Sequence, residues 1–293
     1  MAALLSGKTV AEELTRRLRP RTEALRARGT VPRLILVRCG DNPADLSYAR
    51  GAGKRGTETG VEVRELSLPA LAGREALLEA LERINHDPAI HGCLLFRPLP
   101  KHLRPFEDEI CNALDHAKDV DCMTDLSQAG VFTGKPLGFP PCTAESCIAL
   151  LDGYGIDPAG KRAVVIGRSP VVGRPAALLL LHRNATVTVC HRATVDLPRI
   201  TREADILVTA AGALGSLTAE HVRPGQIVLD VSTNWDEAKP NGKGGLGAFA
   251  GDAVFSEVEP VVEAITPVPG GVGAVTSAVL MSHVIQAAER ACP

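Results

Sequence analysis

The stretch of residues 161–205 constrains the fold more strongly than any other part of the chain. A β-branched apolar run at 163–166 has the composition of a buried parallel strand. It leads into a turn bounded by glycines at 167–173, a helical pattern at 175–181 and a second β-branched run at 185–190. The pattern predicts a β-α-β unit with a glycine turn at its first strand-to-helix junction. Backbone N–H groups and the helix dipole face such a junction, so we expect it to bind the pyrophosphate of a dinucleotide.

The glycine turn departs from the full dinucleotide fingerprint. It reads G-R-S-P-V-V-G, and the acidic residue that usually follows the second strand is absent. Cys190, His191 and Arg192 stand there instead. A carboxylate at this position favours NAD, whereas arginines favour the 2′-phosphate of NADP, so Arg168 and Arg192 are candidate phosphate ligands. The alternative interpretation is that both are solvated surface arginines.

The rest of the chain also alternates between helical and strand patterns. In the first half, the expected helices are 10–28, 44–59, 74–85 and 105–112, and the expected strands are 30–39, 61–66 and 90–96. The second half adds helices at 143–154 and 274–291, strands at 206–210, 227–231 and 264–265, and a mobile Gly/Lys-rich surface loop at 235–249. This alternation predicts an α/β fold with two α/β domains, the second a Rossmann-type dinucleotide-binding domain.

The composition of the 293 residues, with 45% hydrophobic and 23% charged residues, is that of an ordinary globular protein. A net charge of −2 gives no support for a nucleic-acid partner or an anionic membrane surface. The apolar run at 176–181 is too short to span a bilayer. Residues 1–5 are followed at once by Lys8 and Glu12, which does not fit a signal peptide, and we expect a cytoplasmic protein.

The eight cysteines form no C-x-x-C pair, and no Cys/His cluster has the spacing of a metal site. Several lie within apolar runs, as small buried hydrophobic residues do. We interpret them as reduced structural thiols and expect no bound metal.

Five segments, taken together, carry a family resemblance. They are NPADLSYARGAGK (42–54), GCLLFRPLP (92–100), KDVDC (118–122), PPCTA followed by GRSPVVGRP (140–175), and TPVPGGVGAVT (266–276). Their order and spacing resemble the bifunctional methylenetetrahydrofolate dehydrogenase/cyclohydrolase family over nearly the whole chain.

The resemblance implies an activity and an architecture. Family members oxidise 5,10-methylenetetrahydrofolate to the methenyl cation with NADP and then hydrolyse it to 10-formyltetrahydrofolate, and many are homodimers. The folate lies in a cleft between the domains. We therefore expect a folate domain at 1–139 plus 274–293, an NADP domain at 140–273, and a C-terminal helix that returns to the first domain.

The resemblance also implies roles for single residues. The tyrosine matching Tyr48 stacks on the folate and the aspartate matching Asp121 hydrogen-bonds the pterin, and we expect both to be catalytic residues. A flat ring and an N–C–N donor edge suit these two side chains. The expected substrate-binding residues are Tyr48, Phe96, Pro98, Asp121, Pro267, Gly270 and Gly271. The expected cofactor-binding residues are Gly167, Arg168, Ser169, Gly173, Arg192, Ala211, Gly212, Thr233 and Thr276. The residues alone also fit a core tyrosine, a capping or surface aspartate, and a plain turn at 270–271.

Two departures from the family pattern bear on the chemistry. The family lysine four residues after the tyrosine is Ala52 here, and the family glutamine that hydrogen-bonds to it is Phe96. Lys54 is about 200° round a helix from Ala52 and should point away. A smaller departure is Ser232, in place of a family glycine, from which we draw no functional conclusion. Asp252 is expected to be structural.

Methenyl hydrolysis needs an activated water and a moved proton, which apolar side chains cannot supply. We therefore expect weak or absent hydrolysis, while hydride transfer, which needs mainly orientation, survives. Two alternatives remain open. One alternative to the dehydrogenase is a non-catalytic folate/NADP-binding protein. The other is an oxidoreductase that acts on another pterin-like or iminium substrate.

Overall fold

The computed structural model describes residues 1–240 and 245–292, which form two compact units. Unit 1 comprises Met1–Ala11 and Thr143–Thr276, and unit 2 comprises Glu12–Cys142 and Ser277–Pro293. The expected domains, 1–139 plus 274–293 and 140–273, differ from these units at the N-terminus. The reason is that β1 (Ala3–Leu4) pairs in parallel with β11 (Ala264–Ile265), which places the first residues in unit 1.

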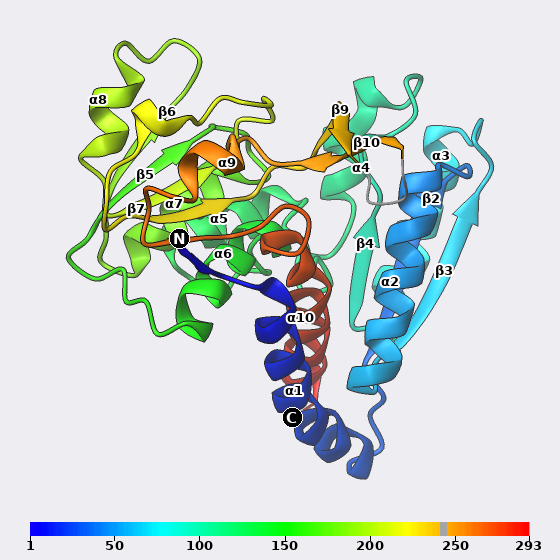
Figure 1. The fold of residues 1–293 in the computed structure, drawn as a ribbon. Coiled ribbons are helices and arrows are strands. Elements are labelled where there is room, and N and C mark those ends of the chain that lie inside the picture. Colours follow the sequence, from blue (N-terminus) through cyan, green and yellow to red (C-terminus); the bar gives the residue numbers. More distant parts are fainter. Residues whose placement is uncertain (241–244, 293) are drawn as a thin grey trace. The chain divides into compact units, whose positions relative to one another are not determined.

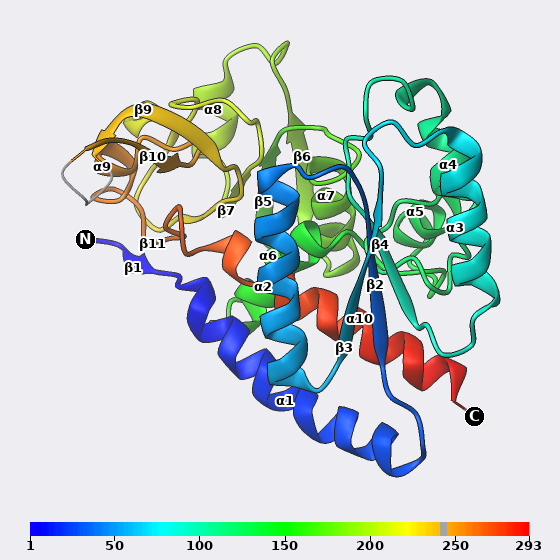
Figure 2. The ribbon, with the colours of Figure 1, turned by 90° about the vertical axis from the view of Figure 1, so that its right-hand side faces the viewer.

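Unit 2 is built on a three-stranded parallel sheet in the order β3-β2-β4. Its strands are β2 (Arg33–Cys39), β3 (Glu62–Leu68) and β4 (Gly92–Leu95). Figure 2 shows this sheet nearly edge-on, with α2 on one side and α3 and α4 on the other. Its helices, including most of α1 and α10, are α1 (Gly7–Ala27), α2 (Pro43–Thr59), α3 (Arg74–His86), η1 (Arg104–Phe106), α4 (Glu107–Asn112), α5 (Asp125–Thr133) and α10 (Thr276–Ala291).

Helix α2 positions several site residues, and its ends are set by local chemistry. Asn42 caps the N-terminus by accepting from the Ala44 N–H at 3.0 Å, and Gly60 ends the helix in a left-handed conformation. The buried face consists of small residues only: Ala49, Ala52, Gly56 and Thr59. A Cβ on Gly56 would lie 2.5 Å from a methyl group of Val63 on β3. This glycine therefore lets the helix approach the sheet closely, which offsets its low helix propensity.

Unit 1 is built on a six-stranded parallel sheet in the order β1-β11-β8-β7-β5-β6. The order reverses at β5, because β6 and β7 lie on opposite sides of it, and such a switch point is where doubly wound sheets bind ligands. Figure 1 shows β5 and β7 side by side. The elements are α6 (Cys142–Gly153), β5 (Arg162–Ile166), α7 (Gly173–His182), β6 (Thr186–Cys190), α8 (Leu197–Arg202), β7 (Ile206–Thr209), η2 (Ala219–His221), β8 (Ile227–Asp230), α9 (Phe255–Val258) and η3 (Val272–Ala274).

The prediction of a mobile loop at 235–249 is wrong for its described residues. They form an antiparallel hairpin of β9 (Asn234–Pro240) and β10 (Leu246–Ala250), and residues 241–244 lie outside the described part of the chain. The rings of Trp235 and Phe249 pack edge to face across the hairpin, with centroids 5.3 Å apart. Such cross-strand aromatic pairs stabilise a two-stranded ribbon, and composition alone gave no sign of this pair.

All eight cysteines are free thiols, and six of them are buried. Burial raises the pKa of Cys111 to about 11 and that of Cys147 to about 12. This agrees with their interpretation as structural thiols. Within the part of the chain that the structure describes, no helix is both long and apolar enough to cross a membrane.

Candidate active site

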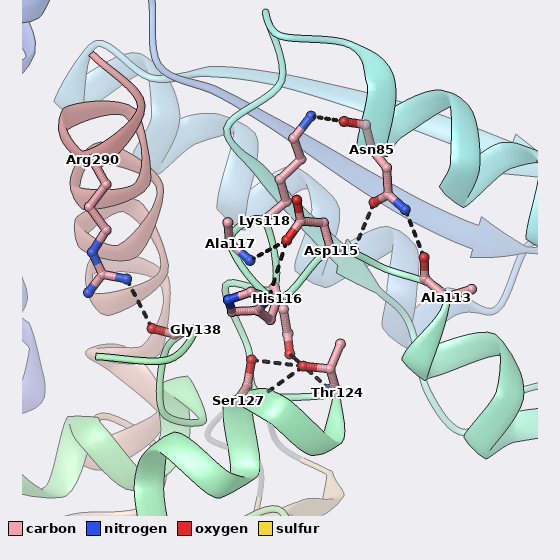
Figure 3. A network of polar contacts seen from close by, with 11 residues as sticks. Asn85, Ala113, Asp115, His116, Ala117, Lys118, Thr124, Ser127, Gly138 and Arg290 are labelled. Carbon is pink, nitrogen blue, oxygen red and sulfur yellow. Dashed lines mark hydrogen bonds and ion pairs between the residues drawn. The ribbon is translucent and has the colours of Figure 1, made fainter. Parts of the chain in front are cut away.

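Lys118 fixes the KDVD segment in unit 2, by its side chain to the end of α3 and by its backbone to β4. The Lys118 ammonium donates to the carbonyls of Ile84, Asn85 and Asp87 at 2.6, 2.9 and 2.7 Å, at the end of α3. Figure 3 shows the hydrogen bond to Asn85. A cation at a helix C-terminus complements both the orphan carbonyls and the dipole. The Cys93 N–H donates to the Lys118 carbonyl at 2.7 Å, so the segment runs beside β4. Lys118 is therefore committed to structure.

The first aspartate of the segment, Asp119, turns the chain. It is fully buried and accepts from the N–H groups of Met123 and Thr124 at 3.0 and 2.8 Å, and from the Thr124 hydroxyl at 2.8 Å. Thr124 in turn caps α5 by accepting from the Ser127 N–H at 3.1 Å (Figure 3). With Asp119 committed in this way, Asp121 is the carboxylate of the segment that remains for a ligand.

Asp121 is held in one orientation by Cys142. Its Oδ1 accepts from the Cys142 N–H at 2.9 Å, and the Cys142 thiol is a further hydrogen-bond partner of the carboxylate. Burial raises the pKa of Asp121, against the opposing effects of the Cys142 N–H and thiol and of the Arg97 charge. An ionised carboxylate has about four lone-pair sites, so Asp121 can still accept from the donor edge of a ligand.

Tyr48 and Phe96 form an apolar wall in the same unit. Tyr48 lies on α2, Phe96 follows β4, and their rings pack edge to face with centroids 5.7 Å apart. Burial raises the pKa of the Tyr48 hydroxyl, and the nearby Cys142 and Asp121 raise it further, so the hydroxyl stays protonated. Pro98 is exposed, two residues after Phe96. The structure thus brings Tyr48, Phe96 and Asp121 together, as a binding surface for a flat ring requires.

Within unit 2, the position four residues after Tyr48 holds no lysine. Ala52 is only 1% exposed on α2, whereas Lys54 is exposed on another face, as expected. Arg55 is committed to Thr15 and Glu58, each at 2.9 Å. Half-buried Arg97, which sequence reasoning missed, makes no hydrogen bond or ion pair within the described residues. Its charge influences Asp121, but a guanidinium does not release its proton in proteins, so it cannot serve as an acid or base.

In unit 1, the turn after β5 leaves no room for a side chain at either of its two glycines. Gly167 has φ of +121°, and a Cβ there would lie 2.2 Å from the Ala210 carbonyl oxygen at the end of β7. A Cβ on Gly173, the first residue of α7, would lie 2.2 Å from the Gly167 carbonyl oxygen. The Ser169 hydroxyl accepts from the Gly173 N–H at 3.3 Å and so closes the turn. This tight backbone cradle before a helix fits a pyrophosphate.

The two arginines proposed as phosphate ligands lie close to this turn. Arg168 follows β5 and Arg192 follows β6, two parallel strands that pair at Ile166 and Cys190. Both arginine side chains are exposed. Their position fits a 2′-phosphate site, and their exposure also fits solvated surface residues.

Buried Asp252 organises the loops that follow β7 and β8. Its carboxylate accepts five hydrogen bonds, from Thr209 Oγ1 (2.8 Å), Ala211 N (2.7 Å), Ala213 N (2.8 Å), Ser232 Oγ (2.8 Å) and Asn234 Nδ2 (3.1 Å). Ser232 also accepts from the Gly212 N–H at 3.1 Å. Asp252 is therefore structural, as expected, and through it the expected cofactor-binding residues Ala211 and Gly212 are held beside the β8 loop. Ser232 takes a role that a glycine could not.

A pocket of about 300 Å³ opens beside these loops in unit 1. Its lining includes Thr233, Pro267, Gly270 and Gly271. Gly270 has φ of +106°, a conformation that a side chain would strain. The Thr276 hydroxyl donates to the carbonyl of Gly273, another lining residue, at 3.0 Å. Residues expected to meet the substrate and residues expected to meet the cofactor thus share one pocket wall.

The doubly wound sheet and the glycine cradle define a dinucleotide-binding α/β protein. Two family models then match the chain. The catalytic domain of tetrahydrofolate dehydrogenase/cyclohydrolase matches residues 5–121, and the NAD(P)-binding domain of the same enzymes matches residues 141–292. The chain belongs to the tetrahydrofolate dehydrogenase/cyclohydrolase family.

Individual relatives agree with this membership. The bifunctional protein FolD of Carboxydothermus hydrogenoformans is 46% identical over 289 residues, which cover 99% of this chain and 98% of the relative. The crystal structure of the bifunctional enzyme of Campylobacter jejuni has a TM-score of 0.91 at 36% identity, and 99% of each chain is covered. The Trypanosoma brucei enzyme, solved with NADP cofactor and an inhibitor, has a TM-score of 0.89 at 32% identity, covering 99% of this chain and 98% of that one.

Proposed function

We propose that this protein is an NADP-dependent methylenetetrahydrofolate dehydrogenase of folate one-carbon metabolism with weak or absent cyclohydrolase activity. The observation that carries this proposal is the wall of unit 2. It keeps Tyr48 and Asp121 for the pterin but has Ala52 and Phe96 where the resemblance places the proton-handling lysine and glutamine.

The residues present suffice for the dehydrogenase half. The face of Tyr48 covers a pterin ring at low entropy cost, and the fixed carboxylate of Asp121 accepts from its N–H edge. The cradle from Gly167 to Gly173 receives the pyrophosphate, and Gly270 permits close backbone approach to a ring. Bound NADP supplies the hydride acceptor. The chain needs only to orient the two ligands, since orientation alone removes much of the barrier of such a step.

The same residues do not support hydrolysis. A positioned acid or base contributes about 10²–10⁴-fold to such a reaction. Ala52 and Phe96 carry no such group, Lys54 points into solvent, and Arg97 keeps its proton. The phenol of Tyr48 has its pKa raised well above the ordinary value, which makes it a poor base near neutral pH.

Parallel assays of both activities test this proposal. We expect wild-type protein to reduce NADP with methylenetetrahydrofolate and to hydrolyse methenyltetrahydrofolate at least about 100-fold more slowly. Ala52→Lys together with Phe96→Gln should raise hydrolysis about tenfold or more, whereas Lys54→Met, which changes an exposed lysine on the same helix, should alter neither activity. If wild-type protein hydrolyses methenyltetrahydrofolate as fast as it forms it, the proposal of weak or absent cyclohydrolase activity is wrong.

One alternative function is favoured by a specific observation. Phe96 adds apolar bulk directly against Tyr48, which suits an altered substrate outline. An oxidoreductase for another pterin-like or iminium substrate would bind NADP normally but form no NADPH from methylenetetrahydrofolate. A non-catalytic folate/NADP-binding protein would bind both ligands in calorimetry without any turnover.

The proposal extends to assembly and compartment. We propose a homodimer, supported by the resemblance and by exposed apolar side chains on the hairpin and beside it: Trp235, Leu246, Phe249 and Phe255. A cytoplasmic location is supported by eight thiols without a disulfide.

A further inference from the structure

The segment at 267–271 lines the pocket of unit 1, yet its backbone has few donors of its own. Pro267 and Pro269 lack an N–H group, so Val268 is the one donor between them. The Gly270 carbonyl accepts from the Gly7 N–H at 2.8 Å, which fixes one end of the segment. The carbonyl of Val268, in the middle, has a different partner.

That partner is Lys239 on strand β9. Its ammonium donates to the Val268 carbonyl at 3.3 Å and to the Phe249 carbonyl on β10 at 2.7 Å. A lysine ammonium has three donors and can bridge two carbonyls in this way. The hydrogen bond to the Val268 carbonyl is partly buried, which strengthens it relative to the same bond in water.

The hairpin that carries Lys239 is closely packed. Across from each other, Trp235 and Phe249 pack edge to face, and Gly247 lies so close beneath Trp235 that a Cβ there would come within 2.6 Å of the indole ring. Lys239 and Val268 together line a second pocket, of about 590 Å³. The ammonium therefore links a packed β-ribbon to a substrate-site segment that is poor in donors.

We infer that Lys239 is a positioning residue, whose ammonium holds the Val268 carbonyl and thereby fixes the 268–271 wall of the ligand pocket. The inference deepens the proposed function and depends on it for the identity of the ligand at this wall. Because an error of about 1 Å in placing reacting groups can cost about 10²-fold in rate, loosening this wall should slow the orientation-dependent step.

Three variants and two readouts test this inference. Lys239→Met removes the donor and keeps most of the length, Lys239→Arg restores a cationic donor, and Lys161→Met is the matched control, a half-buried lysine before β5 in the same unit. The readouts are amide hydrogen exchange over residues 264–276, which needs no substrate, and kcat and KM for NADPH formation from methylenetetrahydrofolate.

We expect Lys239→Met to speed exchange over 268–273 and to lower kcat about tenfold, with the Kd for NADP changed less than about twofold. Lys239→Arg should recover most of both effects, and Lys161→Met should show neither. Unchanged exchange and unchanged kcat in Lys239→Met would overturn the inference, as would an equal fall in Lys161→Met. If Lys239→Met does not fold, Lys239→Leu, which also removes the donor, carries the same two readouts and the same expected results.

The two proposals fail separately. If wild-type protein forms no NADPH from methylenetetrahydrofolate, the proposed function is wrong, but faster exchange in Lys239→Met that Lys239→Arg reverses still supports the positioning role. If wild-type turnover is normal and the lysine variants match it in exchange and kcat, only the positioning role is wrong.

Discussion

Asp230, at the carboxyl end of β8, is a buried carboxylate in an unusual state. It accepts from the N–H groups of Asp252 and Ala253 at 3.0 and 2.9 Å. Burial nevertheless outweighs these hydrogen bonds and, together with the repulsion from Asp252, raises the pKa of Asp230 to about 6. Near neutral pH the protein thus keeps a charge in its interior at a cost in stability, beside the pocket that carries the site.

The sign of the resulting pH dependence follows from linkage. Folded Asp230 binds its proton more tightly than the unfolded chain does, so its contribution to stability should fall as pH rises from about 4 to about 6 and then level off. A shift of about two pKa units corresponds to about 3 kcal/mol. Urea unfolding of wild type and Asp230→Asn across pH 4–7.5 measures it. As pH rises, the free energy of unfolding of wild type relative to Asp230→Asn should fall by about 2–3 kcal/mol. A difference that does not change with pH would contradict the raised pKa of Asp230.

At the residue scale, the sequence points to candidate ligand-binding residues more readily than to the residues that support them. Tyr48 and Asp121 stand out because motifs surround them, and the structure brings them together. Arg97, Lys239 and the Cys142 N–H carry no such signal. Lys239 and the Cys142 N–H act through partners far along the chain, Val268 and Asp121, and Arg97 acts through its charge alone. Such relations depend on packing that no local pattern encodes.

At the scale of elements, two helical glycines have opposite surroundings. Gly173 begins α7 where a Cβ would collide with the Gly167 carbonyl, whereas Gly53 in the middle of α2 has open space around it. The first glycine permits the cradle of the dinucleotide loop. The second only weakens a helix, by the usual penalty of about 0.5–1 kcal/mol relative to alanine.

Alanine substitutions should therefore act in opposite directions. Gly173→Ala should displace the loop, lower the melting temperature and raise the Kd for NADP at least about tenfold. Gly53→Ala should stabilise the protein by about 0.5–1 kcal/mol and leave NADP binding unchanged. Thermal unfolding and fluorescence titration with NADP measure both effects. Equal behaviour of the two variants would show that the close approach at Gly173 does not shape the cofactor site.

The long elements are predictable from sequence and the short ones are not. Apolar periodicity located α1, α3 and the buried strands within a few residues, because those faces must be buried. It missed β1, which has only two residues, and α5, which depends on the Thr124 cap and on Asp119. The β9–β10 hairpin was misread because its glycines and lysines resemble a loop, while one aromatic pair decides its pairing.

At the scale of the whole molecule, the open question is assembly. Trp235, Leu246 and Phe249 are 59%, 68% and 49% exposed on the hairpin of unit 1. Exposed apolar side chains gathered on one ribbon are typical of an interface between subunits. All three side chains belong to unit 1, so we place the proposed dimer contact on that unit.

A charged substitution on the hairpin tests this assembly. We expect wild-type protein to elute with twice the 30.8 kDa mass of one chain, and Trp235→Glu to shift it toward the single-chain mass by burying an unpaired charge. Light scattering coupled to size-exclusion chromatography measures the mass. Arg192→Glu, an exposed site on another loop, serves as the control. A mass of two chains for Trp235→Glu, or a mass of one chain for wild type, would argue against a dimer on this face.

The edge-to-face packing of Phe96 on Tyr48 also has an evolutionary consequence. A lysine at position 52 alone would lie in a buried, apolar setting without a polar neighbour at position 96. A glutamine at position 96 alone would lose the packing on Tyr48 and would place an amide beside no hydrogen-bond partner at position 52. Either single substitution is therefore expected to lower stability without supplying a complete acid–base pair. The two changes would have to occur together, so the weak hydrolysis proposed here would be supplemented by a separate hydrolase more readily than restored in this protein.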